Sequence, residues 1–142
     1  MGKRDDLYSL TGMVEFDEGF FKIAVSPARR KKLKHGKGSQ QMQNVGILAE
    51  SVPLEDPETR EETKHCRFFK MAVLDSQNAE SVNLFIKQNV TLDSVLFSDQ
   101  CKTYQDIHRY VDLHVTERSF KETTIKALKW VHIAIGNAKR TF

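Results

Sequence analysis

Two aspartates that lie in or beside apolar runs are the residues of this sequence best suited to chemistry. Asp17 lies within the segment Leu10–Lys22, and Asp99 directly follows the apolar segment Ser94–Ser98. Open α/β sheets bind ligands at the carboxyl ends of their strands, and neighbouring strands would bring both carboxylates together. Two ionised carboxylates at short range raise each other's pKa, and a divalent cation removes that cost. The pair therefore predicts a Mg²⁺ or Mn²⁺ site that serves phosphoryl transfer on a nucleic acid backbone.

Asn137 is a third candidate ligand, on a segment with helical periodicity near the C-terminus. Its amide carbonyl is an oxygen donor without charge, and therefore a weaker ligand than a carboxylate. Simpler roles stay open: Asp17 as a strand cap or a partner of lysine, Asp99 as a helix cap, and Asn137 as an ordinary polar residue. His132, on the same segment, either assists the site or is a structural histidine.

The net charge of +3 hides two blocks of opposite sign. Residues 19–49 contain no acidic side chain, whereas residues 50–64 are mostly acidic among their charged positions. The members of the basic block are Arg29, Arg30, Lys31, Lys32, Lys34 and Lys37, and a solvated charge run is one reading of it. Lys139 and Arg140, beside Asn137, either contact DNA or balance the dipole at the end of a helix.

The hydrophobic pattern predicts the elements that must position these residues. Period-two or short apolar runs indicate five strands, at Leu10–Lys22, Val45–Val52, Cys66–Leu74, Ser94–Ser98 and Leu113–Thr116. Spacings of three and four indicate helices at Asn78–Asn89, Thr103–Tyr110 and Thr123–Arg140. The segments 26–44 and 53–64 are predicted loops. The order β-β-β-α-β-α-β-α predicts an α/β fold with a mixed sheet, three antiparallel strands followed by parallel ones, flanked by helices.

Length and composition limit the class of protein. The 142 residues suffice for one domain, and no apolar stretch approaches the roughly 20 residues of a membrane span. The N-terminus lacks the apolar core of a signal peptide, and Cys66 and Cys101 cannot form a disulfide scaffold. We therefore expect a cytoplasmic protein with reduced thiols and no membrane partner.

Three segments together resemble a known family. VEFDEGFF at Val14–Phe21, LFSDQCKTY at Leu96–Tyr104 and WVHIAIGNAKR at Trp130–Arg140 are similar to insertion-sequence transposases of the DDE superfamily, in the ISXO-like branch. The matching positions are Asp17 and Asp99, with Asn137 where that family varies between glutamate and asparagine. The resemblance implies a ribonuclease H-like fold for the catalytic domain.

The resemblance also implies a reaction. A metal-activated water would cut DNA at the transposon end and free a 3′-hydroxyl, which the same site would direct at target DNA. Asp17 would bridge two Mg²⁺ or Mn²⁺ ions, Asp99 would hold one, and Asn137 would help to hold the other. The implied partners are DNA ends, target DNA and further copies of the chain, as a dimer or higher multimer. The resemblance also implies that the basic segment from Arg29 to Lys37 contacts DNA phosphates. Glu15 is the better auxiliary ligand of the two neighbouring glutamates, because Glu18 should point to the other face of the strand.

Two features differ from that family. The sequence lacks the CxxC pairs of an N-terminal zinc ribbon, and it ends five residues after Asn137. We therefore expect residues 1–142 to be a catalytic core shortened at its C-terminus. Two alternatives to a transposase stay open: a ribonuclease H-like nuclease with the same ligands, and a non-catalytic remnant that binds DNA or self-associates.

Overall fold

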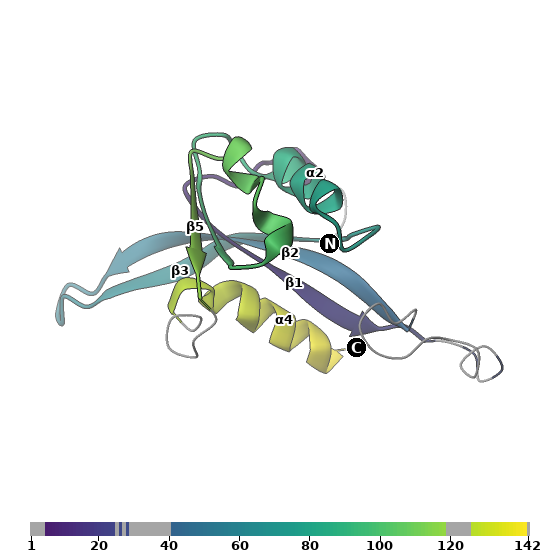
Figure 1. The fold of residues 1–142 in the computed structure, drawn as a ribbon. Coiled ribbons are helices and arrows are strands. Elements are labelled where there is room, and N and C mark those ends of the chain that lie inside the picture. The colour runs from purple at the N-terminus through teal and green to yellow at the C-terminus, as the bar shows by residue number, and fades with distance from the viewer. Residues whose placement is uncertain (1–4, 25, 27, 29–40, 119–125, 142) are drawn as a thin grey trace.

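A computed structural model describes residues 5–24, 26, 28, 41–118 and 126–141 of the chain. These residues form one mixed sheet of five strands in the spatial order β3-β2-β1-β4-β5 (Figure 1). The strands are β1 (Met13–Lys22), β2 (Met42–Glu55), β3 (Glu62–Val73), β4 (Val95–Asp99) and β5 (Leu113–Glu117). β1, β2 and β3 pair antiparallel, whereas β4 pairs parallel with both β1 and β5. The predicted five-stranded mixed sheet is confirmed, and it is compatible with a ribonuclease H-like fold.

The side chains of β1 alternate between two faces of the sheet, as the period of a strand requires. Val14 and Phe16 are fully buried in a core that includes residues of the helix α2 (Ala79–Asn89). Asp17 pairs in register with Ile47, which belongs to a second core on the opposite face, beneath the helix α4 (Lys129–Thr141). Figure 1 shows the two helices on opposite sides of the sheet. The strand therefore presents Asp17 to α4.

Both helices lie where apolar spacing predicts them. Asn78 caps α2 by accepting a hydrogen bond from the backbone N–H of Ser81 at 2.9 Å, and Val82, Phe85 and Ile86 are its buried stripe. α4 begins at Lys129 and buries Val131 against the sheet, with Leu128 just before it. The beginning of the predicted segment, at Thr123, lies outside the described residues.

Half of the segment 53–64, for which a loop is predicted, is strand. β2 continues to Glu55 and β3 begins at Glu62, so that Pro53 pairs with Lys64 near the tip of a long hairpin. The prediction was wrong because it took prolines as the end of a strand. β2 pairs with β1 only as far as Ser51. Beyond Ser51 one edge of β2 is therefore open, and an open edge tolerates a proline.

Two short turns replace the predicted helix over residues 103–110. They are the 3₁₀ helices η2 (Lys102–Tyr104) and η3 (Ile107–Arg109), and a third, η1 (Asp5–Leu7), precedes β1. Each of the two turns buries one apolar or aromatic side chain, Tyr104 in η2 and Ile107 in η3. Among the residues that the structure describes, no helix is long and apolar enough to cross a membrane.

Candidate functional site

The parallel pairing of β1 with β4 brings the two predicted aspartates to the same place. The register joins Met13 to Val95 and Glu15 to Phe97, and the same offset relates Asp17 to Asp99. Asp99 is the last residue of β4, and Phe97, two residues before it, packs into the core beneath α4. Because alternate residues of a strand share a face, both carboxylates lie on the α4 side of the sheet.

The electrostatics of Asp99 reflect this proximity. Burial of the side chain and the negative charges of Asp17 and Glu18 raise the pKa of Asp99, and the backbone N–H of Cys101 and the side chain of His132 only partly offset them. Within the described part of the chain, the buried Oδ1 atom of Asp99 has no hydrogen-bond partner. Such an unpartnered buried oxygen is uncommon in folded proteins and needs an explanation.

His132, on the first turns of α4, contacts Asp17 directly. Its Nε2 atom lies 3.1 Å from Oδ2 of Asp17, whose Oδ1 accepts the backbone N–H of Glu18 at 2.8 Å. The hydrogen bond with Asp17 raises the pKa of His132, against the opposing effect of burial. This contact orients the carboxylate of Asp17; a part of His132 in catalysis stays a prediction.

The His132 pair makes stability depend on pH with a definite sign. A raised folded-state pKa means that the pair stabilises the protein fully below the ordinary value of 6.5 and that this contribution is lost as pH rises through the folded-state pKa. We expect Asp17→Asn to lower the His132 pKa, measured by NMR titration of the imidazole. The pKa of His114, which burial lowers, is the internal control and should not move. An unchanged His132 pKa in the variant would contradict the contact.

Glu18 points to the opposite face of β1, as strand alternation predicts. Its Oε1 atom accepts a hydrogen bond from the hydroxyl of Tyr104 at 2.7 Å, and its Oε2 atom accepts one from the amide of Asn44. Tyr104 belongs to the turn that follows Asp99, and its pKa is raised by burial and by the charge of Glu18. The hydrogen bond between Glu18 and Tyr104 connects β1 to the turn after β4. It lies beyond Glu15 and Phe97, the last paired residues of the two strands.

Asn137 is exposed and does not lie with the two aspartates. It lines a groove between α4 and the β2–β3 hairpin, together with Phe69, Met71 and Ile133. With about 3.6 residues per turn, a residue five positions after His132 points to nearly the opposite side of a helix. The structure thus brings Asp17, Asp99 and His132 together and leaves Asn137 on another face of α4.

The predicted DNA-contacting residues fall into two groups. Lys139 and Arg140 are exposed in the last turn of α4, and Lys139 lies two helical turns after His132, on the same face. The residues of the basic segment lie outside the described residues, so their contact with DNA stays a prediction; they are Arg29, Arg30, Lys31, Lys32, Lys34 and Lys37.

The aspartate pair fits a hard divalent cation in its chemistry. Two carboxylates on one face, one of them with an unpartnered buried oxygen, supply the oxygen donors that Mg²⁺ prefers. Among the described residues, no group of three or more His, Cys, Asp or Glu side chains is placed to hold a metal ion. Mg²⁺ commonly uses one or two carboxylates together with phosphate oxygens, so the two aspartates suffice as protein carboxylates for such a site.

Glu15 is not free to act as an auxiliary ligand. Its side chain is fully buried, its Oε1 atom pairs with Lys64, and its Oε2 atom accepts backbone N–H groups at the start of α4. This role of Glu15 was not predicted from the sequence. A glutamate between the core residues Val14 and Phe16 was the available signal, because a charge buried in a strand needs partners.

The comparisons with known proteins give one match. A family model described as the ISXO2-like transposase domain matches residues 9–142. No curated protein matches the chain, and no solved structure does. The matched range contains β1, β4 and α4, and with them Asp17, Asp99 and His132.

Proposed function

The chain belongs to the family of ISXO2-like transposase domains, and from this premise we propose that it cuts and joins DNA strands with a divalent metal held by Asp17 and Asp99. One observation carries the proposal. The carboxylates of Asp17 and Asp99 come from parallel neighbouring strands and lie on one face of the sheet. They are close enough to each other that the charge of Asp17 raises the pKa of Asp99. This arrangement is costly for a protein without a cation and useful with one.

Each residue then has a distinct task. Asp17 and Asp99 would provide hard oxygen ligands for Mg²⁺ or Mn²⁺, and His132 would hold the Asp17 carboxylate in orientation through its Nε2 atom. Lys139, on the same face of α4, is placed to contact a DNA phosphate. When bound, the metal neutralises charge on the phosphate and lowers the pKa of water.

The proposed reaction has two balanced steps. In the first, the oxygen of water bonds to phosphorus, the bond from phosphorus to the 3′ oxygen breaks, and that oxygen leaves as a 3′-hydroxyl. In the second, this hydroxyl oxygen bonds to a phosphorus of target DNA, and the 3′ oxygen of the target strand leaves with a proton. Positioning and charge neutralisation are the main contributions that a protein makes to such steps.

A strand-transfer assay separates this proposal from its alternatives. A fluorescent duplex that carries the terminal repeat of the insertion sequence and a free 3′-hydroxyl is incubated with the protein, supercoiled plasmid and Mg²⁺ or Mn²⁺. A transposase joins the fluorescent strand to the plasmid. A ribonuclease H-like nuclease nicks the plasmid without joining, and a non-catalytic remnant does neither. Nicking without label on the plasmid would therefore contradict the strand-transfer step.

Asn137 enters the proposal as the third oxygen ligand that the family resemblance implies. Because it lies away from His132 on α4, this role requires the C-terminal part of the helix to turn toward Asp17. We expect Asn137→Ala to reduce strand transfer by about tenfold, less than loss of a carboxylate, because the amide carries no charge. Wild-type activity in Asn137→Ala would remove Asn137 from the site and leave the two aspartates in it.

A further inference from the structure

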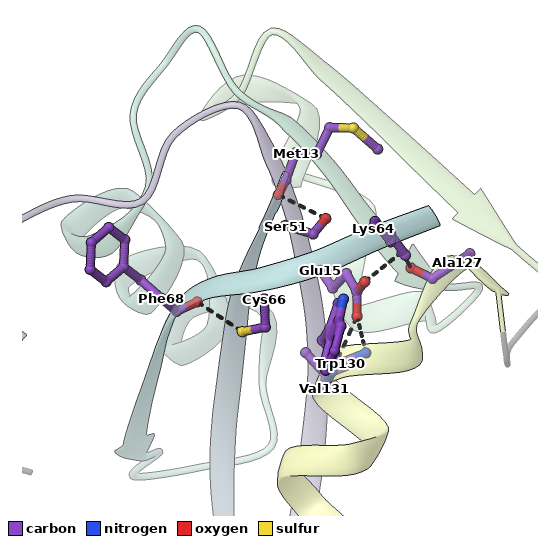
Figure 2. A network of polar contacts seen from close by, with 9 residues as sticks. All are labelled: Met13, Glu15, Ser51, Lys64, Cys66, Phe68, Ala127, Trp130 and Val131. Atoms are coloured by element: carbon purple, nitrogen blue, oxygen red, sulfur yellow. Dashed lines mark hydrogen bonds and ion pairs between the residues drawn. The ribbon is translucent and has the colours of Figure 1, made fainter. Parts of the chain in front are cut away.

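A buried carboxylate two residues before Asp17 joins three elements of the fold. Glu15 has no exposed surface, and it lies on the same face of β1 as Asp17. Its Oε1 atom lies 2.5 Å from Nζ of Lys64 on β3. Its Oε2 atom accepts the backbone N–H groups of Trp130 and Val131, at 2.7 and 3.1 Å (Figure 2).

These contacts compensate the charge of Glu15 and give hydrogen-bond acceptors to the first N–H groups of α4. The first N–H groups of a helix have no partner within the helix, and a negative charge is favourable at that end. Lys64 donates a second hydrogen bond, to the carbonyl oxygen of Ala127 at 2.9 Å, so it holds the chain just before α4 as well. Breaking such a buried pair leaves an uncompensated charge and is strongly destabilising.

The same strand and helix meet again at the candidate site. Glu15 binds the N–H of Val131, and Asp17, the next residue on that face of β1, contacts the side chain of the next residue on α4, His132. Two successive N–H groups that converge on one oxygen restrict both the rotation of the helix and its sliding along the strand. The contact at Glu15 therefore determines where His132 lies relative to Asp17.

We propose that Glu15 is a positioning residue for the reaction at Asp17 and Asp99: paired with Lys64, it holds the start of α4 on β1. The effect of Glu15 on the reaction rests on the proposed function, whereas its placement of the helix does not. It assigns to Glu15 no contact with metal or DNA. The change expected on its removal is in the geometry of the site and in the rate, with binding of DNA preserved.

The test compares Glu15→Gln with a matched control, Glu50→Gln. Glu50 is also buried, also accepts a backbone N–H, that of Thr11 at 2.9 Å, and also lies near a cation, Arg67 at 3.5 Å, but none of these partners belongs to α4. Three measurements are made: amide hydrogen exchange along α4, the emission of Trp130, which is the one tryptophan of the chain, and the kinetics (kcat and KM) of plasmid nicking in Mn²⁺.

We expect Glu15→Gln to speed the exchange of the α4 amides at least about tenfold, as loss of hydrogen bonds to a charged group implies. The emission of Trp130 should shift, and kcat should fall by about tenfold or more with KM unchanged, because a small misplacement of a reacting group is costly. Glu50→Gln should leave the exchange of the α4 amides, the emission of Trp130, and the kcat and KM of nicking at their wild-type values.

Two outcomes overturn the proposal. Wild-type exchange and emission in Glu15→Gln would show that the contact does not hold α4, whatever the activity. A loosened α4 with unchanged kcat would make Glu15 a structural residue only. If the wild-type protein does not nick DNA, the proposed function fails, and exchange and emission still decide whether Glu15 places the helix.

A second variant covers the case in which Glu15→Gln does not fold. Lys64→Gln keeps both N–H bonds from α4 to Glu15 and removes only the cation. We expect the α4 amides to exchange faster than in the wild type, because the buried charge of Glu15 loses its partner. Exchange at the wild-type rate in Lys64→Gln would contradict the claim that the Glu15–Lys64 pair holds the start of the helix.

Discussion

Asp17→Asn and Asp99→Asn are each expected to reduce nicking of supercoiled plasmid in Mn²⁺ by about 1,000-fold. Metal ions contribute several kcal/mol to the stabilisation of charge in a transition state, and each 1.36 kcal/mol corresponds to about tenfold in rate. An amide in place of a carboxylate keeps the shape and removes the charge that would hold the cation. The measurement is the initial rate of conversion of supercoiled to open-circular plasmid.

Asp93→Asn is the matched control for this pair of substitutions. Asp93 is exposed and lies just before β4, at the end opposite to Asp99, so the same loss of charge there should leave the rate within about twofold of the wild type. Equal rates in the wild type, Asp17→Asn and Asp99→Asn would remove the aspartate pair from catalysis. Equal losses in all three variants would indicate a general effect of charge instead of a metal site.

Phe16→Ala is expected to destabilise the fold by about 3–5 kcal/mol, the usual cost of truncating a buried phenylalanine. Phe16 is fully buried between Glu15 and Asp17 in β1. Its ring packs against the rings of Phe85 and Tyr104, with centroids 6.3 and 5.1 Å away. It thus connects the strand that carries Asp17 to α2 and to the turn after Asp99. Equilibrium denaturation in urea measures the change in the free energy of unfolding.

Phe20→Ala, in the same strand, is the control for Phe16→Ala. Phe20 is 37% exposed, so its truncation creates no closed cavity and should cost about 1 kcal/mol or less. Similar losses from the two variants would contradict the assignment of Phe16 to the core. Because Phe16 also supports Tyr104, the Phe16→Ala variant should lose nicking activity even at temperatures where it stays folded.

Much of the site follows from local patterns that need no knowledge of distant contacts. Alternation along Leu10–Lys22 and the apolar run before Asp99 are enough to predict two strands with a carboxylate near the end of each. The α/β order then allows the first and fourth strands to be neighbours, which would bring the two carboxylates together, and β1 does pair parallel with β4. The cap at Asn78 is likewise local, because the side chain binds an N–H only three residues away.

The parts that the sequence did not predict depend on contacts between distant residues. Glu15 meets Trp130 and Val131 across more than a hundred positions, and Lys64 reaches it from a segment that its prolines indicated to be a loop. No periodicity encodes such a partner. The side of α4 that faces the sheet is a similar case: the apolar stripe identifies a helix, but the bonds at its first turn determine that His132, and not Asn137, meets Asp17.

The acidic turn of the β2–β3 hairpin offers the sharpest comparison for a metal test. It contains the three carboxylates Asp56, Glu58 and Glu61, of which Glu58 and Glu61 are exposed and Asp56 is partly exposed. The backbone N–H groups of Glu58 and Thr59 bind Asp56 and lower its pKa, whereas burial and the charge of Asp17 raise that of Asp99. A cation that binds wherever acidic side chains gather would go to both places. A cation held by a specific site would bind at Asp17 and Asp99 and not at the turn.

The central claim, that Asp17 and Asp99 together hold a divalent metal, is tested most directly by titrating the protein with Mn²⁺ and following NMR line broadening residue by residue. The account predicts that the amides around Asp17, Asp99 and His132 broaden first, and that this broadening disappears in Asp17→Asn and in Asp99→Asn. Broadening that begins at the Asp56–Glu61 turn and is the same in both variants would contradict it.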